Sequence, residues 1–124
     1  MKVLIIDDNI NNTEVVSFFL EANGIECNVI TNGRNGLEAI QKEHYDLILL
    51  DLAMPDFSGI DIFDTLKEQN LIGSNNIVIF TASSIDESEI KRMLEEGARG
   101  IVYKPLSIDQ LEDMLKKHLP GIQL

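Results

Sequence analysis

Acidic, hydroxyl and cationic side chains recur in this sequence directly after runs of apolar residues. Asp7 and Asp8 follow the first of four such runs, and Asp51 follows the second. Thr81 and Lys104 follow the third and the fourth. Carboxylate oxygens are ligands that Mg²⁺ prefers, and an aspartate can itself accept a phosphoryl group. A hydroxyl can donate a hydrogen bond to one phosphoryl oxygen, and an ammonium group can neutralise the charge of another. If these side chains converge, they can form a site for metal-assisted phosphoryl transfer.

The apolar runs before these residues are continuous rather than alternating. Continuous runs are typical of parallel strands that are covered on both faces. In open parallel sheets, ligands bind outside the carboxyl ends of the strands, where the strand order reverses. We therefore expect the polar groups to meet in one crevice. The four runs are Val3-Leu4-Ile5-Ile6, Leu47-Ile48-Leu49-Leu50, Ile77-Val78-Ile79-Phe80 and Ile101-Val102-Tyr103.

The stretch after the first run has the periodicity of an amphipathic helix. Asn11 and Glu14 are spaced as a capping pair, and Gly24 is a stop signal. The sequence therefore predicts a first helix whose apolar face has the i, i+3, i+4, i+7 spacing. Its members are Val15, Phe18, Phe19 and Ala22.

Further helical patterns separate and follow the other strands, and a fifth strand is expected at 27–30. Two helices have the residues of a capping box at their start, Ser58 with Asp61 and Ser107 with Gln110. Strands and helices alternate strictly, five of each, as in right-handed βαβ units. This order predicts an α/β fold with a doubly wound, five-stranded parallel sheet. We expect one domain over residues 1–124, with its core at about 2–119.

Composition and charge limit the partners. The chain has 124 residues, of which 44% are apolar, enough for one domain with a buried core. Its formal charge of -11 argues against nucleic-acid binding, which relies on clustered Lys and Arg. The first apolar run is too short for a signal sequence or a membrane span, and Cys27, the one cysteine, is expected in the core. We expect a cytoplasmic protein with protein partners, and neither nucleic acid nor membrane.

Together, the motifs resemble the receiver domain of two-component response regulators. The resemblance covers about 2–119 and rests on Asp7-Asp8, Asp51 in Leu-Leu-Asp-Leu-Ala-Met-Pro-Asp-Phe-Ser-Gly, Thr81-Ala82 and Lys104-Pro105. It implies a flavodoxin-like fold with strand order 2-1-3-4-5, in a stand-alone receiver of the chemotaxis type. It also implies that the chain accepts a phosphoryl group from a histidine kinase or a histidine phosphotransfer protein and then switches a protein-binding surface, whose downstream partner is unknown.

The resemblance also assigns the metal ligands. Asp51 is the phosphoryl acceptor. Asp8 and Asp51 are direct ligands of Mg²⁺, which Mn²⁺ can replace. The backbone carbonyl of Ala53 is a third ligand, and Asp7 acts through water. Carboxylates this close repel one another and raise at least one pKa, a conflict that a divalent ion and an ammonium group remove.

A second group of residues binds the phosphoryl oxygens. Lys104 is expected to pair with Asp51 at rest and with a phosphoryl oxygen afterwards. Thr81, next to Ala82, donates its hydroxyl to another oxygen. A cis peptide before Pro105 is expected to aim Lys104 into the site. When phosphorylation draws Thr81 inward, the surface of the fourth helix, fifth strand and fifth helix is expected to change.

The sequence departs from the receiver pattern in two respects. Ile101 stands where receivers usually carry an aromatic switch residue, three positions before the lysine. Tyr103 either replaces that aromatic or is a core residue with a polar tip, and we favour the core position. Ala53 and Ser83, which flank the acceptor and the threonine, offer neither an amide nor a carboxylate to orient an attacking water. The lifetime of the phosphoryl group is therefore not predicted.

Two other classes of protein fit less well. An aspartyl-phosphate phosphohydrolase needs a second carboxylic acid two residues after its nucleophile, where this chain has Ala53. A flavodoxin-like cofactor carrier needs a phosphate loop rich in Ser, Thr or Gly, where this chain has Asp7 and Asp8. We expect a signalling domain rather than an enzyme, except for its own phosphorylation and dephosphorylation. A phosphate carrier or sink without a conformational output is the alternative.

Overall fold

The computed structural model describes residues 1–82 and 85–124 of one α/β chain. Its strands are β1 (Lys2–Ile6), β2 (Glu26–Ile30), β3 (Leu47–Leu50), β4 (Ile77–Thr81) and β5 (Gly100–Tyr103). Its helices are α1 (Ile10–Ala22), α2 (Gly33–Lys42), α3 (Gly59–Glu68), α4 (Glu87–Glu95) and α5 (Ile108–His118). The strands form one parallel sheet of order β2-β1-β3-β4-β5, which confirms the predicted fold and strand order. Within the described ranges, no helix has both the length and the apolar character that a bilayer span needs.

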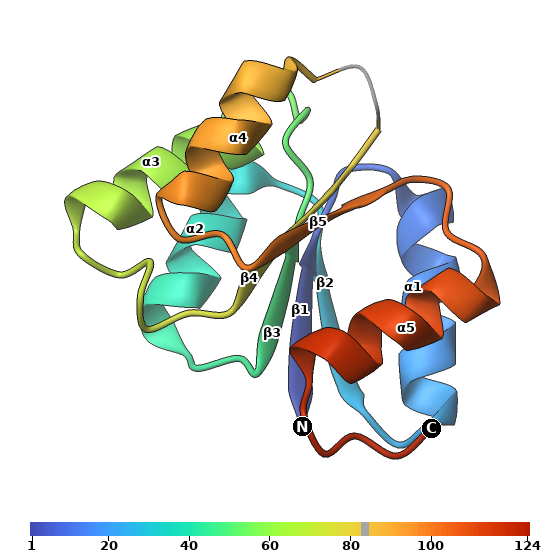
Figure 1. Ribbon diagram of the computed structural model, residues 1–124. Helices are drawn as coiled ribbons and strands as arrows, with labels where there is room; N and C mark the ends of the chain where they lie inside the picture. Colours follow the sequence, from blue (N-terminus) through green and yellow to red (C-terminus); the bar gives the residue numbers. More distant parts are fainter. Residues whose placement is uncertain (83–84) are drawn as a thin grey trace.

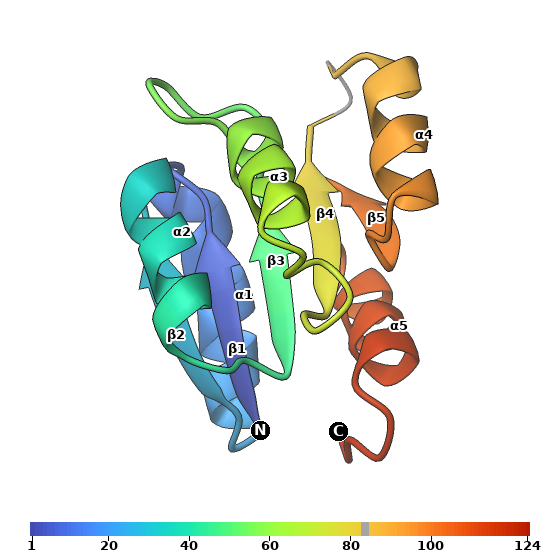
Figure 2. The same ribbon diagram turned by 90° about the vertical axis from the view of Figure 1, so that its left-hand side faces the viewer.

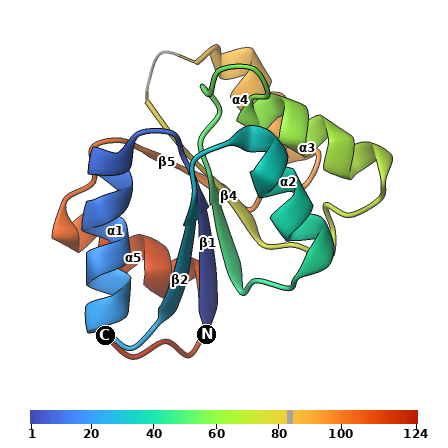
Figure 3. The ribbon, with the colours of Figure 1, turned by 180° about the vertical axis from the view of Figure 1, so that it is seen from behind.

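Helices cover both faces of the sheet. Helices α2, α3 and α4 lie on one face, and α1 and α5 lie side by side on the other (Figures 1 and 3). Strand side chains alternate between the two layers. In β1, Leu4 and Ile6 pack toward α2 to α4, whereas Val3 and Ile5 pack toward α1 and α5. Because the strands are parallel, β1, β3 and β4 all end on the same side of the molecule (Figure 2).

The helix starts follow local capping chemistry. Ser58 and Ser107 each form the predicted capping box, with Asp61 and Gln110 as reciprocal partners. Helix α1 starts differently, because the side chain of Asn9 accepts a hydrogen bond from the Asn11 amide. The predicted capping pair of Asn11 with Glu14 was therefore wrong.

The buried face of α1 also differs from the prediction. Thr13, Val16 and Leu20 face the sheet, whereas Val15 is 55% exposed and Phe18 is 77% exposed. The helix carries two adjacent apolar rows, and periodicity alone cannot decide which row meets the sheet. Packing buries the row of Val16 and Leu20 and leaves an apolar strip on the surface.

Cys27 packs at the margin of the core formed with α1 and α5. Burial raises the pKa of its thiol to about 12, and the negative charge of Glu21 adds to the shift. The thiol therefore stays protonated at neutral pH, as expected of a cysteine that serves packing.

Candidate functional site

Backbone hydrogen bonds that continue the sheet fix two of the acidic residues. The Asp7 amide donates to the Ile30 carbonyl at 3.0 Å, and the Asp51 amide donates to the Ile6 carbonyl at 2.9 Å. Both side chains are buried, while that of Asp8 is exposed. The three aspartates each place a carboxylate oxygen within 4.8 Å of the others. The structure thus brings together the acidic residues that the sequence places at two separate strand ends.

The hydroxyl and the cation reach the same place from β4 and β5. The Lys104 amide donates to the Thr81 carbonyl at 2.9 Å, so the register of the two strands extends past the end of β5. The Thr81 hydroxyl, fully buried, donates to Asp51 Oδ1 at 3.2 Å. The Lys104 ammonium lies 3.6 Å from that same oxygen. Asp51 Oδ1 is therefore the point where hydroxyl and cation meet.

The closest partner of Lys104 is not Asp51. Its ammonium lies 2.5 Å from Asp7 Oδ2, which is buried and accepts no hydrogen bond of good geometry within the described residues. The predicted pairing of Lys104 with Asp51 at rest is present at 3.6 Å, but Asp7, which the sequence did not single out as a partner, lies closer. Burial of a charged oxygen that accepts no hydrogen bond is costly, so the cation stabilises Asp7 Oδ2 more than Asp51 Oδ1. Asp51 Oδ1 already accepts a hydrogen bond from the Thr81 hydroxyl.

The charge balance of the site favours a divalent cation. Burial raises the pKa of Asp51, and the negative charge of Asp7 raises it further. The Lys104 ammonium and the hydrogen bonds from Ala53 and Thr81 offset only part of this shift. A donor set of carboxylate oxygens suits Mg²⁺, whose charge would stabilise the ionised form of Asp51. The residues present therefore fit the metal.

A pocket of ≈ 400 Å³ opens over these groups. The cis peptide between Lys104 and Pro105 lies in its wall, as predicted. Ala53 also lies there, with its amide donating to Asp51 Oδ1 at 3.4 Å. Ser83 falls outside the described residues. The lining residues are Asp8, Asn9, Asn12, Asp51, Ala53, Ala82, Lys104 and Pro105.

Glycine holds the start of α3 against the acceptor. A Cβ atom on Gly59 would lie 2.0 Å from the Asp51 carbonyl oxygen, so a side chain here would force the backbones apart. The Gly59 amide also donates to the Leu52 carbonyl at 3.3 Å. The segment from Asp51 to α3 is thus tightly folded, which fixes the backbone of the acceptor.

A family model described as the response regulator receiver domain matches residues 3–116. The chain belongs to this family. This receiver is therefore a signalling domain of two-component phosphorelays.

Individual proteins agree with this membership. The receiver is 33% identical to sporulation initiation phosphotransferase F of Bacillus subtilis, with 96% of this chain and 94% of that protein covered. It is 31% identical to the receiver domain of Francisella response regulator 1452, with a TM-score of 0.80 and 94% of both chains covered. It is 32% identical to hybrid signal transduction histidine kinase K of Dictyostelium discoideum, with 94% of this chain covered but only 10% of that protein. It also spans about half, 54%, of the transcriptional regulatory protein CrdR of Helicobacter pylori.

The residues expected to act as a switch lie on the α4 side of the receiver's sheet. The register pairs Thr81 with Tyr103 and Ile79 with Ile101. Ile101 packs against the core there, but Tyr103 is 44% exposed. The core position favoured for Tyr103 was therefore wrong. Tyr103 is the last residue of β5, which lies at an edge of the sheet formed by the described residues.

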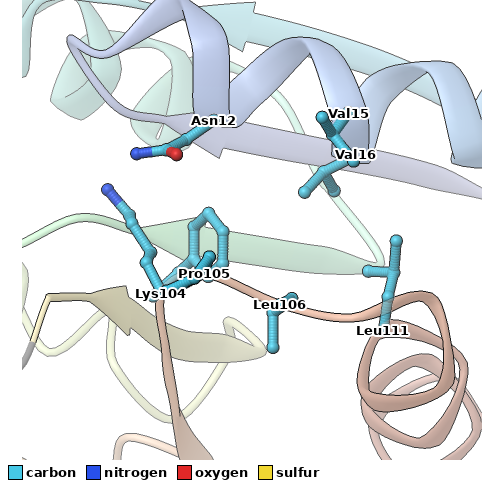
Figure 4. A pocket seen from close by; sticks show the side chains of 8 residues that line it. Asn12, Val15, Val16, Lys104, Pro105, Leu106 and Leu111 are labelled. Atoms are coloured by element: carbon cyan, nitrogen blue, oxygen red, sulfur yellow. The ribbon is translucent and has the colours of Figure 1, made fainter.

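Sequence reasoning missed two neighbours of Lys104. The ring of Phe80 lies 5.1 Å from the ammonium, within reach of a cation–π interaction. Alternation along β4 could have found Phe80, since it faces away from Thr81. Asn12 comes from α1 and, like Lys104, lines both the pocket over Asp51 and a smaller pocket, which Figure 4 shows. Asn12 could have been found only by predicting that the helix starts after Asn9, because Asn12 then lies in the first turn.

Proposed function

We propose that this receiver accepts a phosphoryl group on Asp51 in a reaction that requires Mg²⁺. The donor is a histidine kinase or a histidine phosphotransfer protein, with which the receiver shares the cytoplasm. The main support is that the Thr81 hydroxyl and the Lys104 ammonium meet at Asp51 Oδ1, at 3.2 and 3.6 Å. The names of two relatives, a phosphotransferase and a histidine kinase, are consistent with this chemistry.

Four residues would hold the metal. Asp8, Asp51 and the carbonyl of Ala53 are the direct ligands in this proposal, and Asp7 acts through water. When bound, Mg²⁺ supplies positive charge to the phosphoryl oxygens and to the carboxylates. The three carboxylates already lie within 4.8 Å of one another, so the chain needs little rearrangement to bind it.

The chain's own residues position and neutralise the reacting groups. A carboxylate oxygen of Asp51 attacks phosphorus while the P–N bond of the phosphohistidine breaks, and the electron pair returns to the imidazole ring. The Thr81 hydroxyl donates to one phosphoryl oxygen, and the Lys104 ammonium pairs with another. Such a reaction depends on positioning and charge neutralisation rather than on a strong base.

The apolar strip of α1 is the surface that we assign to the donor. It borders a hollow of ≈ 490 Å³ lined by Val15, Phe18 and Ile108 among others. Val15 also lines a smaller pocket of ≈ 70 Å³ that reaches Lys104 and Pro105. A protein helix lying on this strip would therefore be next to the phosphoryl site. Exposed apolar surface beside a reactive site is typical of a protein-binding region.

The output surface is formed by α4, β5 and α5 in this proposal. Thr81 pairs with Tyr103 across β4 and β5, so movement of the Thr81 side chain toward a phosphoryl oxygen changes the space beside Tyr103 and Ile101. A receiver that only carries or sinks phosphate, without this change, is the second candidate. The exposed position of Tyr103 favours the first, because an exposed ring can contact a partner directly.

Intact mass measurement tests the proposal. Incubation with acetyl phosphate and Mg²⁺ should add one phosphoryl group to the wild type and none to Asp51→Asn. Chelation of Mg²⁺ should abolish the addition. Equal labelling of Asp51→Asn, or labelling that ignores the chelator, would contradict the proposal.

A further inference from the structure

Asn12 lies where two pockets adjoin. It belongs to the first turn of α1 and is half-buried. It lines both the pocket over Asp51 and the smaller pocket beside it. Lys104 and Pro105 also line both pockets. The carboxamide of Asn12 and the ammonium of Lys104 point toward one another across the opening (Figure 4). Any molecule that approaches the acceptor from the α1 side passes this carboxamide.

The Asn12 side chain forms no hydrogen bond with any other residue of 1–82 and 85–124. At the start of α1, the Asn9 side chain accepts from the Asn11 amide, and the Thr13 hydroxyl donates to the Ile10 carbonyl. Within the described residues, the Asn12 carboxamide takes part in none of these hydrogen bonds. Its two N–H donors and its oxygen are therefore available to a group that enters the pocket.

Of the other described lining residues, Asn9 also has a carboxamide, but its oxygen caps α1 by accepting from the Asn11 amide. Ala53, Ala82 and Pro105 contribute no polar side-chain atom. The carboxylate of Asp8 repels phosphoryl oxygens, and Asp51 carries the phosphoryl group itself. Lys104 is held by Asp7, at 2.5 Å. A water molecule that attacks an aspartyl-phosphate must be held in place, and an uncharged carboxamide can do this without repelling the phosphoryl group.

We propose that Asn12 positions the water that hydrolyses the phosphoryl group on Asp51 and so sets the lifetime of the phosphorylated state. The inference rests on the proposed function of Asp51. In this step the water oxygen bonds to phosphorus as the P–O bond to Asp51 breaks, and the electron pair returns to the carboxylate. The proton of the water leaves with the phosphate or to solvent. Asn12 only accepts and donates hydrogen bonds, so it is a positioning residue.

The test compares three variants of the full chain. Asn12→Leu keeps the size of the side chain and removes its amide, whereas Asn12→Gln keeps the amide. Asn11→Leu is the matched control, since Asn11 is the exposed neighbour outside both pockets. Each protein is phosphorylated with acetyl phosphate and Mg²⁺, the donor is removed, and loss of the phosphoryl group is followed by intact mass. Thermal melting verifies that each variant is folded.

We expect Asn12→Leu to lose its phosphoryl group about fivefold more slowly than the wild type, the factor that one neutral hydrogen bond contributes to a rate. Asn12→Gln should recover at least part of the rate, and Asn11→Leu should match the wild type. Wild-type decay in Asn12→Leu, or equal slowing in the Leu and Gln variants, would overturn this inference alone. Failure of the wild type to take up phosphate would overturn it together with the proposed function.

Discussion

Lys104 is held by Asp7: its ammonium lies 2.5 Å from Asp7 Oδ2, closer than the 3.6 Å to Asp51 Oδ1. Asp7 is fully buried, and the Lys104 side chain is 10% exposed. The pair with Asp7 keeps the Lys104 ammonium beside Asp51, and the single carboxylate does not use all of its hydrogen-bond donors. A phosphoryl group on Asp51 then meets an ammonium that is already in place, which limits the reorganisation that the reaction requires.

Removing the cation should destabilise the fold. We expect Lys104→Met to lower the free energy of unfolding by about 2 kcal/mol in the absence of Mg²⁺, because Asp7 keeps a buried charge without a partner. Addition of Mg²⁺ should restore part of the loss. Denaturant unfolding with and without the metal measures both effects. Lys91→Met, which alters an exposed lysine on α4, is the control and should unfold like the wild type. A metal-free Lys104→Met as stable as this control would show that the pair with Asp7 does not stabilise the fold.

The metal should stabilise the folded state through Asp8. A ligand that binds only the folded state raises the melting temperature by mass action, so Mg²⁺ should do so in the wild type. The rise should largely disappear in Asp8→Asn. Without metal, this variant should be at least as stable as the wild type, since one of three crowded carboxylates is gone. Asp56→Asn, in the loop before α3, is the control. Identical Mg²⁺ affinities of the wild type and Asp8→Asn by calorimetry would mean that Asp8 is not a ligand.

The apolar strip of α1 should affect phosphoryl transfer from a protein donor and not from a small phosphodonor. Phe18 is 77% exposed, so Phe18→Ser should leave folding and uptake from acetyl phosphate unchanged. Transfer from the most active of the host's phosphorylated histidine kinases should fall at least about tenfold, as for an aromatic anchor of an interface. Glu21→Ser, an exposed change on the same helix outside the hollow, is the control. Equal kinase transfer in both variants would place the donor elsewhere.

A phosphoryl mimic should perturb the surface of α4, β5 and α5. With beryllofluoride and Mg²⁺, chemical shifts should change from Thr81 through Ile101 to the α4 residues Ile90 and Leu94. A change at Tyr103 would show that its ring takes part in place of the missing aromatic. If the shifts are confined to the pocket, the receiver is a phosphate carrier without a conformational output. The same spectra with Asp51→Asn serve as the control, and they should not respond.

The resemblance to receiver domains predicted the strand order, and the residue pattern predicted the gathering of Asp7, Asp8, Asp51, Thr81 and Lys104. Strand ends converge in any doubly wound sheet, so the position of each residue in its run carried this information. The choice between the two apolar rows of α1 was not predictable, because it depends on packing against the sheet. Nor was the exposure of Tyr103, which follows from its place at the end of an edge strand. The preference of Lys104 for Asp7 needs the burial of both carboxylates, which local patterns do not contain.

Direct localisation of the phosphoryl group tests the central claim. The wild type is treated with acetyl phosphate and Mg²⁺, reduced with borohydride, which converts an aspartyl-phosphate to homoserine, and digested for peptide mass mapping. The account predicts homoserine at position 51 alone, and none in a sample prepared without acetyl phosphate. Conversion of Asp7, Asp8 or another residue in place of Asp51 would contradict it.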